Sequence, residues 1–597
     1  MPKRLSVRLP VLLLALALAP LAAAAEDWIE RSNENAQWLL REQARFSPES
    51  AGQNGLDGVD EEITDLAPGR SERLIEANEA QIAELRRRLA EERDPRVRQD
   101  LEILLASVDR NLRGTRLNHE LTVPYFNLPQ MMYFGIAGLL NPQIPEERHP
   151  AALMRLRRYA GQEAGYAPAT EQARALIKAR SEESGLIWPY RPQVESDLTN
   201  SGHFMGGIRQ LFESLSIEGY EPALAALEAQ VAGYNDFVRS EILPHARADF
   251  VLPPELYALA LERWGVESTP DALIRDATAA FASIRNEMAA LAPLVAAERE
   301  WDTTDYREVI RLLKKDRFDA DSILSTYRET NAALEEIIRR EDIVSLPPRE
   351  VAIRMKTPAE EAALPAPSLQ TPRLVGNTGE VVEFLLPAGR NSEGGAHGGG
   401  HGGGDDMVFK ATAWTLAAHE MRPGHELQFS TMLESGVSDT RALFAFNSVN
   451  VEGWALYAEA EMKPYFPLEG QLIGLQHRMM RAARAFLDPM LNTGQISIAD
   501  ARRVLTDEIV LSPSMAETEI QRYTFRMPGQ ATAYFYGYKQ LMALRVRTEL
   551  VLGEAFDRRE FHDFILAQGL LPPPLLERAV TEEFIPSRTV VLSNNTL

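Results

Sequence analysis

Two histidines and a glutamate lie close together in one stretch of the chain. His419 and Glu420 are adjacent, and His425 follows six residues after His419. Imidazole nitrogens are common zinc ligands, and a glutamate beside them can take a proton from a water molecule that the metal polarises. We therefore expect His419 and His425 to bind Zn²⁺ and Glu420 to act as a general base.

The spacing of the two histidines does not suit a regular α-helix. Four residues turn a helix by about 400° and return a side chain to the same face, whereas six residues turn it by about 600°. Pro423 and Gly424 lie between the histidines. Proline removes a helical hydrogen bond, and glycine tolerates the distorted backbone that results. We expect a two-residue bulge here to return both histidines to one face.

A third metal ligand is expected from a later helical segment. Glu452 and Glu459 are seven residues apart in this segment, so both lie on one helix face. Glu452 is the expected ligand, and Glu459 is expected to orient one of the ligand histidines. For this segment alone, the alternative is a helix surface that carries two glutamates.

Together these motifs resemble one bacterial family. The matching residues are His419-Glu420-x-x-Pro423-Gly424-His425, Glu452-Gly453-Trp454-Ala455-x-Tyr457-x-Glu459, Arg522-Tyr523, and Pro528-Gly529-Gln530-Ala531-x-x-Tyr534-x-x-Gly537. The family is catalogued as a domain of unknown function and is placed among the gluzincin metallopeptidases. The resemblance implies a mostly α-helical, cleft-forming architecture similar to thimet oligopeptidase, angiotensin-converting enzyme and carboxypeptidase Taq. It also implies zinc ligation by His419, His425 and Glu452.

The chain departs from the family pattern in three places. Members carry a second histidine where this chain has Glu426, and they tend to carry a histidine where it has Asn492. The Gly/His-rich tract of residues 394–404 looks like an insertion. Its composition predicts a solvated loop, and the alternative is a lid over the cleft or a loop that captures zinc. These differences leave the expected ligands intact and bear on substrate preference.

Two further residues are candidates for the catalytic machinery. A tyrosine hydroxyl can donate a hydrogen bond to an oxyanion, and Tyr534 holds the family position among three clustered tyrosines. The alternative is that these tyrosines pack in the core. Arg522 is expected to grip a substrate carboxylate through paired hydrogen bonds, and the alternative is an ion pair with Glu519 at the surface.

The elements that must position these residues are expected to be mostly helical. Amphipathic patterns at residues 71–93 and 97–117 predict a helical hairpin. Residues 374–386 combine a turn signal with β-branched alternation, which predicts a small hairpin or edge strand near the active site. Asp405 and Asp406 offer N-cap chemistry for a helix from about Met407. We divide the chain into an N-terminal helical region at 26–362, a linker at 363–406 and a C-terminal zinc-site region at 407–597.

Composition excludes several classes of function. The chain has 597 residues, with 86 acidic and 63 basic side chains, a net charge of −23 and no cysteine. Without cysteine there are no disulfides, thiolate nucleophiles or cysteine-ligated metals, so a metal must be held by histidine and carboxylate. The acidic balance argues against nucleic-acid binding, because neutralising phosphates needs clustered lysine and arginine.

The first 25 residues are typical of a secretory signal peptide. A basic start precedes an apolar run from Val11 to Ala19, and small residues end at Ala25, near which we expect cleavage. The run is too short to span a bilayer stably, and no cysteine is available to carry a lipid. The sequence therefore predicts a periplasmic or secreted protein without a stable membrane anchor.

These observations together predict an exported zinc metallopeptidase that hydrolyses short peptides. The sequence leaves endo- and exopeptidase action open, and a role for Arg522 as a carboxylate clamp would favour carboxypeptidase or dipeptidase action. Two alternatives stay open. One is a catalytically silent peptide-binding or scaffold protein that keeps the fold. The other is a zinc hydrolase that acts on non-peptide amides or esters.

Overall fold

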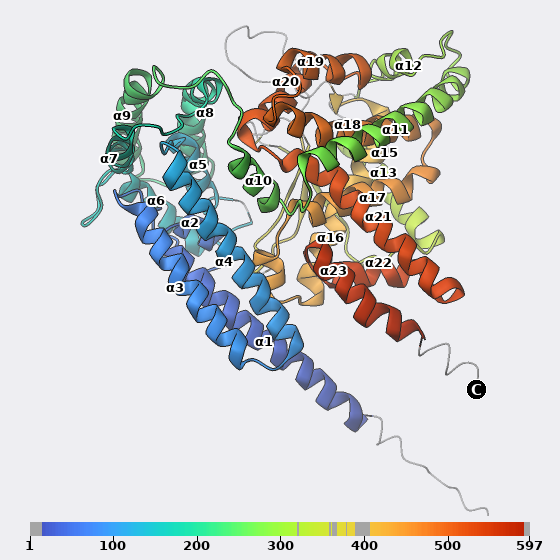
Figure 1. The fold of residues 1–597 in the computed structure, drawn as a ribbon, viewed down its shortest axis with the longest axis horizontal. Helices are drawn as coiled ribbons and strands as arrows, with labels where there is room; N and C mark the ends of the chain where they lie inside the picture. Colours follow the sequence, from blue (N-terminus) through green and yellow to red (C-terminus); the bar gives the residue numbers. More distant parts are fainter. Residues whose placement is uncertain are drawn as a thin grey trace, which may run out of the picture.

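The computed structural model describes residues 15–589 except 142, 319–321, 357–359, 361–366, 378 and 388–405. Within these residues the chain is mostly α-helical and has one small three-stranded sheet, as the sequence predicts. The N-terminal helices gather on one side of the molecule and the C-terminal helices on the other (Figure 1). None of the described helices combines the length and hydrophobicity that a membrane-spanning segment requires.

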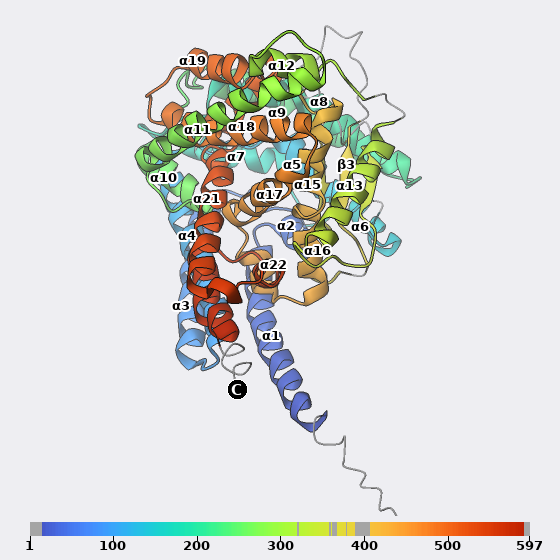
Figure 2. The ribbon, with the colours of Figure 1, turned by 90° about the vertical axis from the view of Figure 1, so that its right-hand side faces the viewer.

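The N-terminal side is built from nine labelled helices. They are α1 (Ala15–Ala44), α2 (Pro48–Gln53), α3 (Arg70–Glu91), α4 (Pro95–Leu121), α5 (Leu128–Ala137), α6 (His149–Tyr159), α7 (Ala169–Ser181), α8 (Arg191–Ser214) and α9 (Glu221–Phe237). The predicted helical hairpin is confirmed, since α3 and α4 lie side by side (Figures 1 and 2). Their apolar stripes, which include Leu85 and Leu104, are buried in one shared core. Helix α1 runs across Ala25, the predicted cleavage position.

The remaining helices form the C-terminal side. They are α10 (Pro254–Arg263), α11 (Pro270–Glu298), α12 (Tyr306–Leu313), α13 (Ile323–Arg340), α15 (Ala413–Glu420), α16 (His425–Ser435), α17 (Ser448–Met462), α18 (Leu468–Asn492), α19 (Ile498–Arg503), α20 (Pro513–Gln521), α21 (Ala533–Leu552), α22 (Arg558–Ala567) and α23 (Pro573–Ala579). Helix α18 is central: it packs along α11, and nearly all of its side chains are buried.

Helices α17 and α21 cross closely because both have a glycine at the contact. A Cβ on Gly537 would lie 2.0 Å from the carbonyl oxygen of Val449, and a Cβ on Gly453 would lie 2.7 Å from the backbone of Gly537. No other residue type fits these two positions without moving a helix. The crossing holds α17, which carries Glu452, against α21, which carries Tyr534.

The sheet has strand order β1-β3-β2. Strand β1 (Ala352–Met355) pairs in parallel with β3 (Glu383–Leu386), and β2 (Ser368–Gln370) pairs with β3 in antiparallel register. The expected strand at 374–386 is therefore confirmed only at its end. It is the central strand of the sheet rather than an edge strand, because β1, which the sequence pattern does not reveal, covers its other side. The sheet joins segments on both sides of the predicted boundary at residue 363.

The predicted start of the helix, at about Met407, is wrong. Residues 407–409 are not helical, a short 3₁₀ turn covers Lys410–Thr412, and α15 begins at Ala413. The reason is that Asp406 does not cap a helix. Its buried carboxylate instead forms an ion pair with Lys314 and accepts a hydrogen bond from the backbone N–H of Ser512.

Candidate metal centre

The chain breaks its helix between the two histidines of the motif. Helix α15 ends at Glu420 and α16 begins at His425, so the predicted two-residue bulge is a complete four-residue interruption. The interruption requires glycine at position 424, because a Cβ there would lie 1.9 Å from the carbonyl oxygen of His419. It brings the two imidazole rings to a centroid separation of 4.8 Å with an angle of 82° between their planes. The predicted sharing of one face is thus achieved by a different backbone path.

A buried arginine holds the interruption in place. The Arg422 guanidinium donates hydrogen bonds to Glu426, at 2.8 Å, and to Glu335, also at 2.8 Å. It donates a third bond to the backbone carbonyl of Arg349. The indole N–H of Trp454 donates to the carbonyl of Pro423 at 2.9 Å. Glu426 is therefore a buried counter-charge of Arg422.

Glu452 completes a compact cluster with the two histidines. Its Oε2 atom lies 3.5 Å from Nε2 of His419 and 3.3 Å from Nε2 of His425. One ligand atom from each of the three residues lies within 4.8 Å of the others. A tetrahedral zinc ion with bonds of about 2.0–2.1 Å holds its ligand atoms about 3.4 Å apart. The spacing of the carboxylate oxygen from both imidazoles therefore fits a zinc ion.

Two polar atoms of the cluster residues lack a hydrogen bond. Among the described residues, Oε2 of Glu452 and Nδ1 of His425 are buried and have no hydrogen bond of good geometry. A buried carboxylate oxygen without a partner is costly unless a cation or donor satisfies it. Oε2 of Glu452 faces Nε2 of both histidines, so a metal ion between these three atoms would satisfy the carboxylate oxygen.

Glu459 lies behind His419 as the sequence predicts. The His419 Nδ1–H donates to Oε1 of Glu459 at 2.6 Å, so Nε2 is the nitrogen that faces the cluster and that a metal would bind in place of its proton. Glu459 is held in turn by the Thr415 hydroxyl, at 2.8 Å, and by Arg481, at 3.3 Å. Burial raises the pKa of Glu459, but the charge of Arg481 and the bond to His419 outweigh it and lower the pKa to about 2. Glu459 is therefore an ionised anchor for the imidazole.

Replacing Glu459 with Gln tests this anchoring role. The amide keeps the volume but removes the negative charge that fixes the His419 tautomer. We expect the zinc affinity to fall by about 10- to 100-fold, the range typical of residues that orient a metal ligand. Competition against a fluorescent chelator measures the affinity, and Glu434→Gln on the exposed side of α16 is the matched control. An unchanged affinity in Glu459→Gln would contradict the role.

A cavity of about 510 Å³ opens onto the cluster. Glu420 lines it beside the three candidate ligands, and no hydrogen bond or ion pair of the Glu420 carboxylate is found among the described residues. The other walls come from strand β2, from α16 and from the π-helical turn Thr440–Phe444 with the residues that follow it. Phe429 and Phe446 give these walls an apolar surface. The Glu420 carboxylate is thus available to a small molecule in the cavity.

Of the three clustered tyrosines, Tyr534 alone lines this cavity. Its ring lies nearly parallel to that of His419 at 6.4 Å, whereas the hydroxyl of Tyr536 donates to the backbone carbonyl of Glu267 and Tyr538 lies against Arg478. Burial raises the pKa of Tyr534, so its hydroxyl stays protonated and able to donate. Tyr534 thus lines the cavity beside His419, and it is also buried, as the packing alternative expects.

Arg522 lies at the back of Tyr534 and does not line the cavity. Its guanidinium carbon is 5.8 Å from the Tyr534 ring centroid, and it contacts Glu519 at 3.4 Å. Glu519 is fully buried and is already bound by Arg484 through two bonds of 2.7 Å. The ion pair with Glu519 considered from sequence is present, but it is not a surface pair, because Glu519 is buried and Arg522 is only partly exposed.

Sequence reasoning missed several residues around the cluster. Arg481 and Arg484 of α18 surround the Tyr534 ring at 6.0 and 4.7 Å, and Asn54 reaches the cavity from the N-terminal side. The spacing of the two arginines, three residues apart on one helix face, was the available signal; nothing local marks Asn54. The Gly/His-rich tract 394–404 lies outside the described residues.

Comparison with known proteins shows the family and the fold. The profile of a bacterial family described as a protein of unknown function (DUF885) matches residues 48–580. A "putative lipoprotein of unknown function" from Shewanella oneidensis has a similar structure, with a TM-score of 0.71 and 18% identity, covering 92% of this chain and 99% of that chain. A "putative lipoprotein" from Colwellia psychrerythraea gives 0.73 and 17%, covering 94% and 99%. The curated proteins include no significant match.

Proposed function

The chain belongs to DUF885, a bacterial family of unknown function, and from its own site residues we propose that it is a zinc-dependent metallopeptidase of gluzincin type. The observation that carries the proposal is the cluster of His419, His425 and Glu452, whose spacing fits a tetrahedral zinc ion. Glu420 lies beside this cluster on the wall of the same cavity. Two histidines, one carboxylate and an adjacent free glutamate are the donor set of a hydrolytic zinc site.

The side chains of the cavity divide the chemistry between them. Zinc, when bound, lowers the pKa of a water molecule and polarises a carbonyl group. Glu420 takes the proton of the attacking water and passes it to the departing amine. The Tyr534 hydroxyl donates a hydrogen bond to the oxyanion that develops on the substrate. Glu459 holds the imidazole of His419 in the required tautomer throughout.

The shape of the cavity favours a peptide over other amides. Strand β2 is at the edge of the sheet, and its residues Ser368 and Leu369 line the cavity. An edge strand presents unpaired backbone groups to which an extended peptide can add. Phe429 and Phe446 supply apolar contacts for substrate side chains. A non-peptide amide or ester would use the zinc and Glu420 but not the strand edge.

The proposed carboxypeptidase or dipeptidase mode depends on Arg522. Its contact with Glu519 is long, and Arg484 satisfies that carboxylate, so the Arg522 guanidinium keeps donors for a substrate carboxylate. Its side chain is 24% exposed. We propose that a substrate terminus reaches it past Tyr534.

Export is part of the proposal. The N-terminal pattern is that of a signal peptide, and the two structural neighbours are described as lipoproteins, which are exported. This chain has no cysteine that could carry a lipid. We propose that it works as a protein released into the periplasm or the medium.

Cleavage of a mixed peptide library, analysed by mass spectrometry, tests the function. We expect the zinc-loaded protein to shorten peptides, a chelator to stop cleavage, and added zinc to restore it. Cleavage that survives complete removal of the metal would contradict a zinc peptidase. If the zinc-loaded chain cleaves no peptide but hydrolyses non-peptide amides or esters, the non-peptide alternative is favoured.

The affinity for zinc is expected to depend on pH through His419. Burial lowers the pKa of His419, but Glu452 and Glu459 outweigh it and raise the pKa from 6.5 to about 9 in the metal-free chain. The proton stabilises the metal-free fold below pH 6.5, and this contribution is lost as the pH rises through about 9. Because zinc must displace the proton, its affinity should rise about tenfold per pH unit in this window. Chelator competition at several pH values measures the slope; a flat profile would contradict it.

A further inference from the structure

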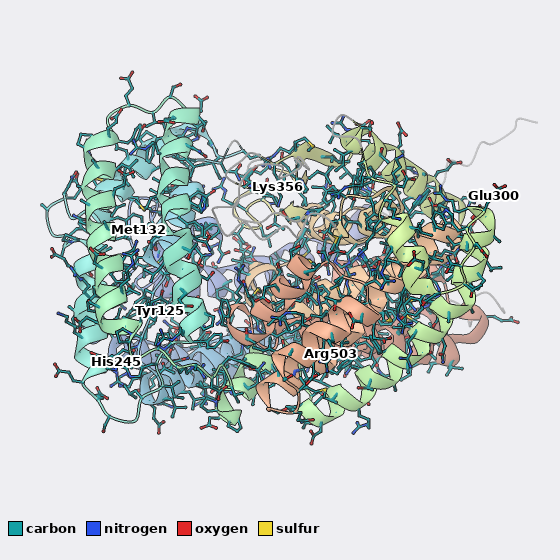
Figure 3. The ribbon with its side chains drawn as sticks, turned by 90° about the horizontal axis from the view of Figure 1, so that it is seen from above. Tyr125, Met132, His245, Glu300, Lys356 and Arg503 are labelled. Carbon is teal, nitrogen blue, oxygen red and sulfur yellow. The ribbon has the colours of Figure 1, made fainter. Side chains whose placement is uncertain are left out.

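A second and larger cavity lies beside the metal-site cavity. It has a volume of about 940 Å³ and is lined by α1, α3, α4, the end of α7 and α10, together with the loops that follow α4 and precede α8. Asn54 lines both cavities, so the two meet at this residue. Tyr125, one of its wall residues, is labelled on the N-terminal side of the molecule in Figure 3. The two cavities thus have Asn54 as a common wall residue.

The charge of this cavity is opposite to that of the protein. Its walls contain five arginines and only two acidic residues, Glu72 and Glu183, both exposed. The whole chain, in contrast, has 86 acidic and 63 basic residues. A cavity lined by one sign of charge concentrates ligands of the other sign. The local field here thus favours anions, although the net charge of −23 would repel them.

Three of these arginines have no counter-charge. Arg70, Arg110 and Arg247 are half-buried, and none forms an ion pair within 4.0 Å among the described residues. Burial lowers the pKa of each guanidinium by more than the neighbouring carboxylates raise it. Arg70 donates one hydrogen bond to the backbone carbonyl of Asp65, at 2.7 Å, and Arg247 donates one to that of Val251, at 2.8 Å. No carboxylate pairs with these half-buried charges, which costs free energy that a bound anion would recover.

The nearest carboxylates are already engaged by other arginines. Glu262, beside Arg110, accepts bonds of 2.8 and 2.5 Å from both ends of the Arg113 guanidinium. Asp65, beside Arg70, binds Arg73 at 2.7 Å through one oxygen and a backbone N–H through the other. At Arg247, the Nε atom is buried without any partner. Arg70, Arg110 and Arg247 are therefore left without a carboxylate partner, whereas Arg180 in the same walls pairs with Glu183.

We propose that this cavity binds an acidic segment of a peptide ligand, whose carboxylates pair with Arg70, Arg110 and Arg247. The inference rests on the proposed peptidase function for the identity of the ligand as a peptide. A guanidinium binds a carboxylate through two parallel hydrogen bonds, and Trp188 and Tyr190 in the same walls offer flat surfaces to peptide backbone and apolar side chains. The metal centre would then act on peptides that carry acidic residues at a distance from the scissile bond.

Peptide binding to the full, metal-free chain tests the inference without any cleavage. The probe is fluorescein-labelled Ser-Glu-Gly-Glu-Ser-Glu-Gly, and its partner is the same peptide with Gln in place of each Glu. Fluorescence anisotropy at low salt is expected to show at least about tenfold tighter binding of the Glu peptide, since one charge-assisted bond contributes that much. The Arg110→Gln/Arg247→Gln double variant should bind the Glu peptide and the Gln peptide with similar affinity.

A matched control separates the cavity from the overall field. Arg239→Gln/Arg503→Gln removes the same charge from arginines whose side chains are 54% and 69% exposed and outside the cavity. Arg503 is labelled in Figure 3 on the C-terminal side, away from Tyr125. This control should keep the preference for the Glu peptide. The proposal would be overturned if the unmodified chain bound the two peptides equally well. It would also be overturned if the control variant lost the preference for the Glu peptide as fully as the Arg110→Gln/Arg247→Gln variant does.

The outcome is independent of the metal chemistry. The comparison of the two peptides on the unmodified chain needs no variant, and thermal unfolding checks that each double variant is folded. If the preference is found but the zinc-loaded chain cleaves no peptide, the peptidase function fails while the acidic-peptide site stands. If peptides are cleaved and no preference is found, the site fails alone.

Discussion

Glu420→Gln is expected to remove peptide cleavage while leaving the metal site intact. The amide has the size of the carboxylate but cannot take a proton from the attacking water. General-base catalysis contributes about 10²- to 10⁴-fold, so we expect kcat to fall by about 10³-fold with little change in KM. Zinc content should not change, because Glu420 lines the cavity without joining the three-residue cluster. Steady-state kinetics on one cleaved peptide measure the effect.

The control for this variant is Glu434→Gln, which makes the same chemical change on α16. The Glu434 side chain is 47% exposed, pairs with Arg349 and lies outside the cavity. It should retain the activity of the unmodified chain. Turnover that persists undiminished in Glu420→Gln would contradict the assigned base, even if zinc is bound.

Gly424→Ala is expected to damage the metal centre through the backbone alone. The added methyl group would lie 1.9 Å from the carbonyl oxygen of His419 and 2.5 Å from that of Ala418, distances that no Cβ tolerates. The interruption between α15 and α16 must shift, which separates His419 from His425. Overpacking of this kind lowers the free energy of unfolding by about 3 kcal/mol. If the same free energy is lost from zinc binding, the zinc affinity falls about 100-fold. Calorimetric unfolding and chelator competition measure the two effects.

A helical glycine with open space around it is the matched control. A Cβ on Gly206 in α8 would meet nothing within 4 Å. Gly206→Ala should therefore be neutral or slightly stabilising, because alanine favours a helix more than glycine does. If Gly424→Ala keeps the zinc affinity and the stability of the unmodified chain, the close contact with His419 does not determine the geometry of the centre.

The core of the site was predictable from sequence because ligand chemistry has strict spacing. His419, His425 and Glu452 have side chains that bind zinc. Their spacing allows a shared site only if the helix breaks between the histidines and a later helix supplies the glutamate. The structure brings the three residues together. Glu459 was placed by helical periodicity from Glu452, and it contacts His419 as expected. In both cases the signal is the spacing of residues within one helical segment, although the contacts themselves join α15 and α17.

The remaining features depend on contacts between distant segments. Nothing near Glu426 shows that its partner Arg422 also needs Glu335, which is about 90 residues earlier in the chain. Asp406 has the composition of a helix cap, but a tertiary ion pair with Lys314 takes its carboxylate. The arginine-lined cavity is assembled from many segments, so the net charge of the whole chain does not indicate its local sign.

The central claim is that His419, His425 and Glu452 hold one zinc ion. The most direct measurement is the zinc content of the purified chain, determined by mass spectrometry after equilibration with micromolar free zinc, for the unmodified protein and for His425→Ala. The account predicts one zinc ion per chain in the unmodified protein and a loss of zinc in the variant, with both proteins folded. An unmodified chain that retains no metal, or a variant that retains as much, would contradict it.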